Sequence, residues 1–167
     1  MIGLSTIFTP ITTGAFVKGK FPKYQFLAYR NIVIRESKRL RKEGANAVVL
    51  IAHVGDMCSG SFKYRIWKKE TKQKECQRGE ITRLIDSLPE KTVDGIVQGH
   101  THVVAHHFRK GIPYMGNING GFYFNVMYLH FNSKKEVIDA KIEGPIPVCE
   151  KIFSKVKNCY FVKDKDL

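Results

Sequence analysis

The chain has 167 residues and a formal net charge of +13, with 28 lysine and arginine residues against 15 aspartate and glutamate residues. Hydrophobic residues make up 43% of the chain and charged residues 26%, which excludes a disordered chain and allows one domain with a real core. No apolar run reaches the roughly 20 residues that a membrane-spanning helix needs, and the glycines and prolines follow no fibrous repeat.

The first half of the sequence alternates segments of strand and helix type. Two helices are expected, each with apolar side chains at helical spacing, over residues 29–43 and 80–88. Gly44 follows the first helix in the place of a capping glycine, and Pro89 closes the second. Short, continuously apolar strands are expected before, between and after these helices, at residues 2–8, 47–52 and 93–97.

The pattern changes after residue 103, where strand-like segments follow one another without helices. They are separated by turn residues such as Lys110-Gly111 and Asn132-Ser133, and they span residues 103–108, 112–115, 122–131 and 137–142. Helices that alternate with apolar strands indicate a layered α/β fold. In such folds, functional groups gather at the carboxyl ends of the parallel strands.

The start of the chain is apolar, but residues 1–16 lack the basic segment and the cleavage pattern of a secretion signal. A strand that belongs in the middle of a domain is expected there instead. This indicates either an unusual amino terminus or a chain taken from a larger protein.

Three of the six histidines lie beside glycine where a predicted strand ends. His53 follows the strand at 47–52 in the segment AHVG, and His100 and His102 follow the strand at 93–97 in GHTH. Imidazole binds zinc, iron and manganese-class metals, and a tight turn lets these rings point into one site. H-x-H spacing alone is a weak signal, because alternating strand histidines are also structural. A third histidine at an equivalent strand end favours a metal site.

Four other polar residues are expected to have structural roles. His106 and His107 are adjacent, so they face opposite sides of a strand, and His130 alternates with aromatic residues on another. Asp94 opens its strand, where a capping or turn role is expected rather than catalysis.

The positive charge is concentrated in residues 18–42 and 63–83. A solvated basic surface is expected there, or an attraction for anionic substrates. Dedicated nucleic-acid binding is not expected, because the sequence has no zinc-finger spacing, no aromatic RNA-binding strand and no basic heptads.

The cysteines form no C-x-x-C pair, so a structural zinc site is not expected. They are compatible with two disulfides in an oxidising compartment or with free thiols in a reducing one, and their pairing is left open. The four are Cys58, Cys76, Cys149 and Cys159.

Three segments carry the histidine motifs and the strands around them: GANAVVLIAHVG (44–55), VDGIVQGHTH (93–102) and GIPYMGNINGGFYFNVMYLHF (111–131). In this order, they resemble the metallophosphoesterase domain of the 5′-nucleotidases, in the calcineurin-like phosphoesterase superfamily. The similarity extends over residues 2–150. Its most specific element is GHTH after a D-x-I-V strand, with an upstream strand that ends in H-x-G.

This resemblance implies part of a four-layer α/β/β/α sandwich that holds two divalent metal ions of the zinc, manganese or iron class. It implies that His53 and His100 bind one metal and that His102 binds the other. In the family, the metals clamp a phosphate oxygen and activate a water for in-line attack on phosphorus. The resemblance also implies that residues 1–150 form the C-terminal half of a catalytic domain and that residues 151–167 lead into a C-terminal substrate domain.

The other metal motifs of the family, D-x-H, G-D-x-x-D and G-N-H-[DE], do not occur in the sequence. Gly55-Asp56 lacks the second aspartate, and Gly116-Asn117 lacks the histidine. Without a bridging carboxylate, the repulsion between two metal ions has no local compensation, so the chain alone is expected to be inactive. A missing first half is also expected to leave strand 47–52 or 93–97 with an exposed apolar edge.

The function that the resemblance implies is hydrolysis of phosphoric esters, with nucleoside 5′-phosphates as substrates of the full-length parent. It implies an extracellular, cell-surface or secretory-lumen location and leaves membrane anchoring open. Two alternatives remain at this stage. One is a basic module that binds anions or nucleic acid, and the other is a shortened, non-catalytic relative that acts as an interaction protein.

Overall fold

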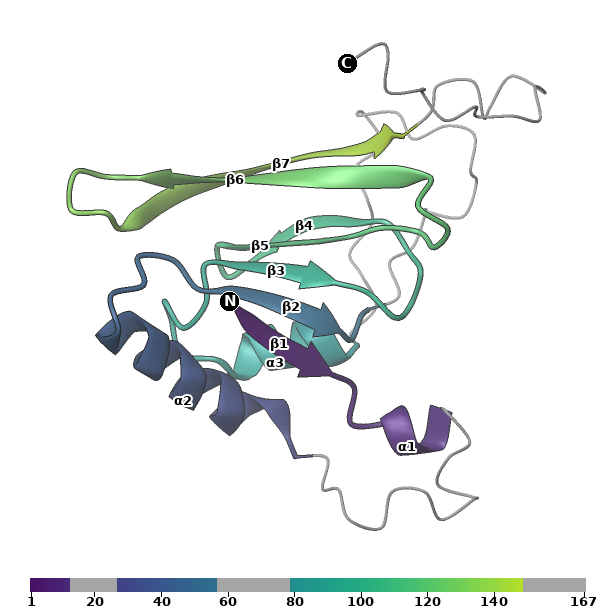
Figure 1. Ribbon diagram of the computed structural model, residues 1–167, viewed down its shortest axis with the longest axis horizontal. Coiled ribbons are helices and arrows are strands. Elements are labelled where there is room, and N and C mark those ends of the chain that lie inside the picture. Colours follow the sequence, from purple (N-terminus) through teal and green to yellow (C-terminus); the bar gives the residue numbers. More distant parts are fainter. Residues whose placement is uncertain (13–26, 57–78, 149–167) are drawn as a thin grey trace, which may run out of the picture.

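The computed structural model describes residues 1–12, 27–56 and 79–148 (Figure 1). Within them, a five-stranded sheet has the order β1-β2-β3-β5-β4, and a second sheet pairs β6 with β7. The five strands of the first sheet are β1 (Ile2–Ser5), β2 (Val49–His53), β3 (Gly95–Gln98), β4 (Ala105–Arg109) and β5 (Ile112–Gly116). Every neighbouring pair in it is parallel except β4 with β5. The α/β class predicted from the sequence is confirmed.

Helices and strands cover opposite faces of the five-stranded sheet (Figure 1). On one face lie α2 (Tyr29–Lys42) and α3 (Glu80–Ser87). Over the other lies the antiparallel pair β6 (Tyr123–Phe131) and β7 (Val137–Pro147). The predicted ends of both helices hold, since Gly44 has a left-handed φ of 97° directly after the α2 cap and Leu88 caps α3 before Pro89.

The first predicted strand is shorter than expected. The sequence predicts residues 2–8, but β1 ends at Ser5 and a short helix, α1 (Thr9–Thr12), follows. The Thr6 carbonyl oxygen accepts hydrogen bonds from both the backbone nitrogen and the side-chain hydroxyl of Thr9, at 3.1 and 2.6 Å. These bonds turn the chain away from the sheet.

The prediction that strand 47–52 or strand 93–97 has an exposed apolar edge is wrong. β2 lies between β1 and β3, and β3 lies between β2 and β5, so both apolar strands are paired on each side. The edge positions belong to β1 and β4. β1 pairs over its whole length with β2, from Ile2 opposite Leu50 to Ser5 opposite His53.

The core lies between the sheet and the helices. Alternate side chains of β2 and β3 point into it, so that Leu50 and Ile96 are fully buried against apolar residues of α2 and α3. On the opposite face, Ile51 is 46% exposed. The β6–β7 pair therefore leaves part of this face of the sheet uncovered near β2.

The two sheets approach closely where β3 begins. A Cβ atom at Gly95 would lie 2.5 Å from the Met127 sulfur of β6, so a larger residue there would require the flexible Met127 side chain to move. At the other end of β3, the Asn125 side-chain amide donates a hydrogen bond of 2.9 Å to the carbonyl of Gly116, which lies opposite Gln98. β7 also continues past its predicted end at residue 142, because its pairing with β6 extends to Pro147 opposite Tyr123.

All four cysteines lie outside the described residues, as do residues 18–26 of the first basic segment and residues 63–78 of the second. Within the described ranges, no helix is long and apolar enough to cross a membrane.

Replacement of Leu50 by alanine is expected to lower the free energy of unfolding by about 3 kcal/mol, because it leaves a cavity in the core between β2 and the helices. Ile51→Ala, at the next position on the same strand, is the matched control and is expected to cost below about 1 kcal/mol, since Ile51 is half exposed. Urea unfolding followed by circular dichroism measures both. Equal costs at the two positions would show that the helices do not cover the predicted face.

Candidate metal centre

The histidines gather at the carboxyl edge of the sheet. β2 and β3 are parallel and in register, with Ala52 opposite Gln98, so the residues that follow them lie side by side. His53 is the last residue of β2, and His100 lies in the turn after β3. Their nearest ring nitrogens, His53 Nε2 and His100 Nδ1, are 3.2 Å apart. The ring centroids are 4.9 Å apart, with one ring edge-on to the other.

Backbone contacts hold the two histidine turns together. The Gly99 nitrogen donates hydrogen bonds to the carbonyl oxygens of Ala52 and Val54, at 2.9 and 3.3 Å. A Cβ atom at Gly55 would lie 2.3 Å from the Gly99 carbonyl oxygen, so a residue with a side chain cannot occupy position 55 without separating the turns. The glycine of the H-x-G motif is therefore required by the close approach of the GHTH turn.

The GHTH turn has an unusual backbone. His100 and His102 both have left-handed φ angles, of 73° and 53°, which few residues other than glycine adopt. Between them, the Thr101 hydroxyl donates a hydrogen bond of 3.0 Å to the Asp56 carbonyl oxygen. Strained backbone of this kind often marks functional turns, and here it occurs at two residues that the sequence predicts as metal ligands.

In the structure, the His53 and His100 side chains are close together, but His102 does not join them in one cluster. Among residues 1–12, 27–56 and 79–148, no group of three or more His, Cys, Asp or Glu side chains is close enough to hold one metal ion. His102 lies two positions after His100 in the same turn and is exposed. Its role as a ligand of a second metal stays a prediction.

The His53–His100 pair fits two ligands of one metal ion. Zinc binds histidine nitrogen at about 2.0–2.1 Å, so two nitrogens on one tetrahedral zinc lie about 3.3 Å apart. The observed separation is 3.2 Å. The His53 side chain is exposed and that of His100 half-buried, so an ion between them would keep open positions for further ligands.

Asp56 has a role that the sequence did not reveal. Its side chain is fully buried, and its two carboxylate oxygens accept hydrogen bonds from the Ile81 and Thr82 backbone nitrogens, at 3.0 and 2.9 Å. These are unpaired donors of the first turn of α3, so Asp56 caps this helix from a distant part of the chain. A Cβ atom at Gly79 would lie 2.2 Å from one of these oxygens, which explains the glycine before the helix.

Burial raises the pKa of the Asp56 carboxyl above its ordinary value, and the backbone hydrogen bonds from Thr82 and Ile81 oppose this without reversing it. From the sequence, Gly55-Asp56 is interpreted only as an incomplete metal motif, not as a helix cap. The cap was missed because Asp56 lies 25 residues before the nitrogen that it binds, whereas local capping rules consider adjacent residues.

A second polar network joins β1, α2 and α3. The Glu80 carboxylate accepts hydrogen bonds from the Thr6 hydroxyl at 3.1 and 3.2 Å and from the Tyr29 hydroxyl at 2.6 Å. Burial, followed by the bond to Glu80, raises the pKa of the Tyr29 hydroxyl. The Thr6 nitrogen in turn donates to the His53 carbonyl at 3.2 Å, so this network borders the histidine pair.

The remaining polar residues have the structural positions that the sequence favours. His106 is hydrogen-bonded to the Gly144 carbonyl at 3.2 Å, and its neighbour His107 stacks on Tyr114, with ring centroids 5.6 Å apart. His130 is exposed on β6. Asp94 accepts hydrogen bonds from the Val48 nitrogen at 2.6 Å and from Arg41 at 2.7 Å, so its role is structural, but it joins distant segments instead of capping a local turn.

No protein-family model, no curated protein and no solved structure matches this chain. The resemblance to metallophosphoesterases therefore stays a prediction from the sequence motifs. What the structure adds is the geometry of the histidine pair at the sheet edge.

Asp56→Ala is expected to lower the free energy of unfolding by about 2 kcal/mol, because it leaves the buried Ile81 and Thr82 nitrogens without acceptors. Urea unfolding measures this change. Asp139→Ala, at an exposed position on β7, is the control and is expected to have little effect. A cost for Asp56→Ala no larger than that of the control would contradict the capping role.

The raised pKa of Asp56 predicts a pH dependence. Below about pH 4, the carboxyl is protonated in both the folded and the unfolded chain, and its stabilising contribution is fully present. As pH rises from there through the raised pKa of the folded state, the unfolded chain ionises first, and this contribution is lost. Asp56→Asn cannot ionise, so the stability of the wild type relative to this variant is expected to fall over that window. Urea unfolding at a series of pH values tests it, and a constant difference would overturn it.

Proposed function

We propose that this chain supplies histidine ligands to the metal site of a phosphoric-ester hydrolase that acts on nucleoside 5′-phosphates. The observation that carries the proposal is the 3.2 Å separation of His53 Nε2 and His100 Nδ1 at the carboxyl edge of the sheet. The order of the H-x-G and GHTH motifs along the chain adds support. The four-layer sandwich is the architecture proposed for the complete catalytic domain.

His53 and His100 would hold one metal ion, and His102 is proposed to bind a second. Bound divalent metals supply charge neutralisation for a phosphate oxygen and a water of lowered pKa. The contribution of this chain is to fix the two imidazoles in advance. His53 is anchored by the parallel strands, and His100 is held by the Gly55–Gly99 contact, so little conformational freedom is lost when a metal binds.

Two nearby carboxylates are not proposed as ligands. Both Asp56 oxygens accept backbone hydrogen bonds at the start of α3, and Glu80 accepts bonds from Thr6 and Tyr29. Withdrawing either carboxylate would leave buried donors without partners. We therefore assign the carboxylate ligands of the site to D-x-H and G-N-H-[DE] motifs, which this sequence does not contain.

Metal binding by the 167-residue chain is the first arm of the test. We expect Co²⁺ to bind with the absorption bands of a nitrogen-ligated ion, and His53→Ala or His100→Ala to weaken binding by roughly tenfold or more. His130→Ala, an exposed histidine on β6, is the matched control and is expected to bind as the wild type does. Equal affinities of the His100→Ala variant and the wild type would refute the site.

Hydrolysis of AMP and p-nitrophenyl phosphate is the second arm. The 167-residue chain is expected to be nearly inactive with added Mn²⁺ or Zn²⁺, because it lacks the carboxylate motifs. A longer form that carries D-x-H and G-N-H-[DE] upstream is expected to hydrolyse both. In that form, His100→Ala should lower kcat/KM by at least about 100-fold. Full activity of this variant would exclude the proposed role.

A further inference from the structure

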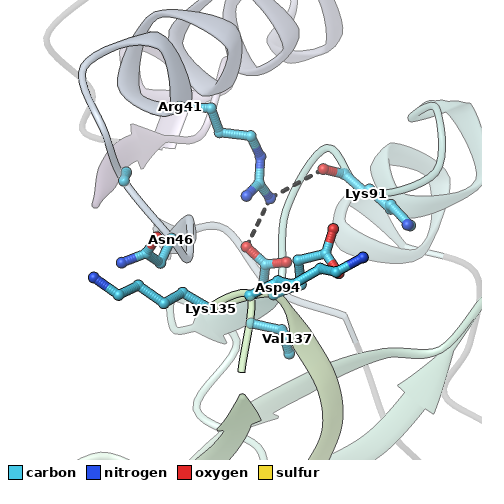
Figure 2. A pocket seen from close by; sticks show the side chains of 9 residues that line it. Arg41, Asn46, Lys91, Asp94, Lys135 and Val137 are labelled. Atoms are coloured by element: carbon cyan, nitrogen blue, oxygen red, sulfur yellow. Dashed lines mark hydrogen bonds and ion pairs between the residues drawn. The ribbon is translucent and has the colours of Figure 1, made fainter. Parts of the chain in front are cut away.

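A basic cavity lies at the opposite end of the sheet from the histidines. It has a volume of about 300 Å³ and is bounded by the loops that precede β2 and β3, by α2, and by the turn between β6 and β7. Figure 2 shows Arg41 reaching from α2 toward Asp94, with Lys91 and Lys135 on either side of this pair. The walls therefore come from four segments that are distant in the sequence.

The lining has an excess of positive charge. Four cationic side chains face two carboxylates, which leaves two positive charges without a counterpart in the lining. The cations are Arg41, Lys91, Lys134 and Lys135, and the carboxylates are Asp94 and Glu136. The cavity is open to solvent, and its three lysines are exposed, so a dianion can reach them from bulk water. An excess of this size matches a dianion better than a neutral or cationic ligand.

The acidic groups already have partners. Asp94 is paired with Arg41 at 2.7 Å and also accepts the Val48 nitrogen at 2.6 Å. Glu136 accepts a hydrogen bond of 2.9 Å from the Asn132 amide. In the part of the chain that the structure describes, the ammonium groups of Lys91, Lys134 and Lys135 form no ion pair. The three lysines therefore retain their capacity to bind an anion.

Two of these lysines stand where the backbone favours glycine. Lys91 has a φ of 57° and Lys135 a φ of 61°, both in the left-handed region. Each lies in a tight turn, the first closed by the bond from the Thr92 nitrogen to the Pro89 carbonyl and the second by the bond from the Lys135 nitrogen to the Asn132 carbonyl. Glycine would adopt both conformations without strain. Two strained lysines that face one cavity indicate a role for their charge rather than for their backbone.

We propose that this cavity binds a small phosphate-bearing dianion. A volume of about 300 Å³ is at the lower end of small-molecule sites and suits a phosphate with a short organic group. Lysine ammonium groups bind phosphate oxygens as point charges, and the Arg41–Asp94 pair fixes the floor between them. The site is separate from the histidine pair, and it does not depend on the proposed hydrolase function.

Isothermal titration calorimetry of the 167-residue chain in metal-free buffer tests the proposal, with inorganic phosphate and glycerol 3-phosphate as separate probes. Both are expected to bind the wild type. Lys91→Gly and Lys135→Gly are each expected to weaken binding by roughly tenfold or more while raising the thermal midpoint, because each removes a charge and relieves strain. Tighter binding of glycerol 3-phosphate than of phosphate would show that the organic group is also recognised.

Two control variants test whether loss of any surface lysine charge, or relief of any left-handed lysine, changes phosphate binding. Lys38→Ala removes an exposed charge of α2 outside the cavity, and Lys110→Gly relieves another left-handed lysine, with φ 50°, that does not line it. Both are expected to bind phosphate as the wild type does, and so is His100→Ala.

Three results would overturn the proposal. The first is no binding of either probe to the wild type. The second is unchanged binding in the folded Lys91→Gly and Lys135→Gly variants. The third is binding of a single-stranded oligonucleotide only, which would indicate a nucleic-acid surface instead.

Discussion

The parallel pairing of β2 with β3 is the constraint on which both ends of the molecule depend. Because the two strands run in the same direction and in register, the residues directly after one lie beside those directly after the other, and so do the residues directly before them. At the carboxyl edge, this places His53 against His100. At the amino edge, it places Asp94 against Val48, where the carboxylate binds the backbone nitrogen at 2.6 Å. One element of sheet geometry thus builds the histidine pair and the floor of the basic cavity.

Two buried or half-buried aspartates connect this sheet to its helices. Asp56, after β2, caps the first turn of α3, and Asp94, before β3, binds Arg41 near the end of α2. Both carboxylates satisfy backbone donors that no adjacent residue reaches. α3 is thereby attached to the carboxyl edge of the sheet and α2 to its amino edge. The turn that carries His100 is also linked to Asp56, because the Thr101 hydroxyl donates a hydrogen bond to the Asp56 carbonyl.

Most non-glycine residues with a left-handed φ angle lie near one of the two edges of the sheet. Among the described residues, His100 and His102 lie at the carboxyl edge and Lys91 and Lys135 at the cavity on the amino side, while Lys110, in the turn between β4 and β5, belongs to neither. In each place, a histidine or lysine occupies a backbone conformation that glycine would adopt more easily. The metal ligands and the anion-binding lysines are thus proposed at the two ends of the same strands. The intervening core of Leu50 and Ile96 keeps the two sites apart.

The sequence by itself determined the α/β class, the approximate limits of α2 and α3, and the placement of the glycine-flanked histidines at strand ends. These features depend on local periodicity and on residues near one another in the chain. Only the tertiary structure showed that β1 covers the edge of β2, that Asp56 caps α3 and that Lys91 and Lys135 face one cavity. It also brought His53 and His100 together without His102. Strand order and contacts between distant segments arise from packing of the whole chain, and no local pattern encodes them.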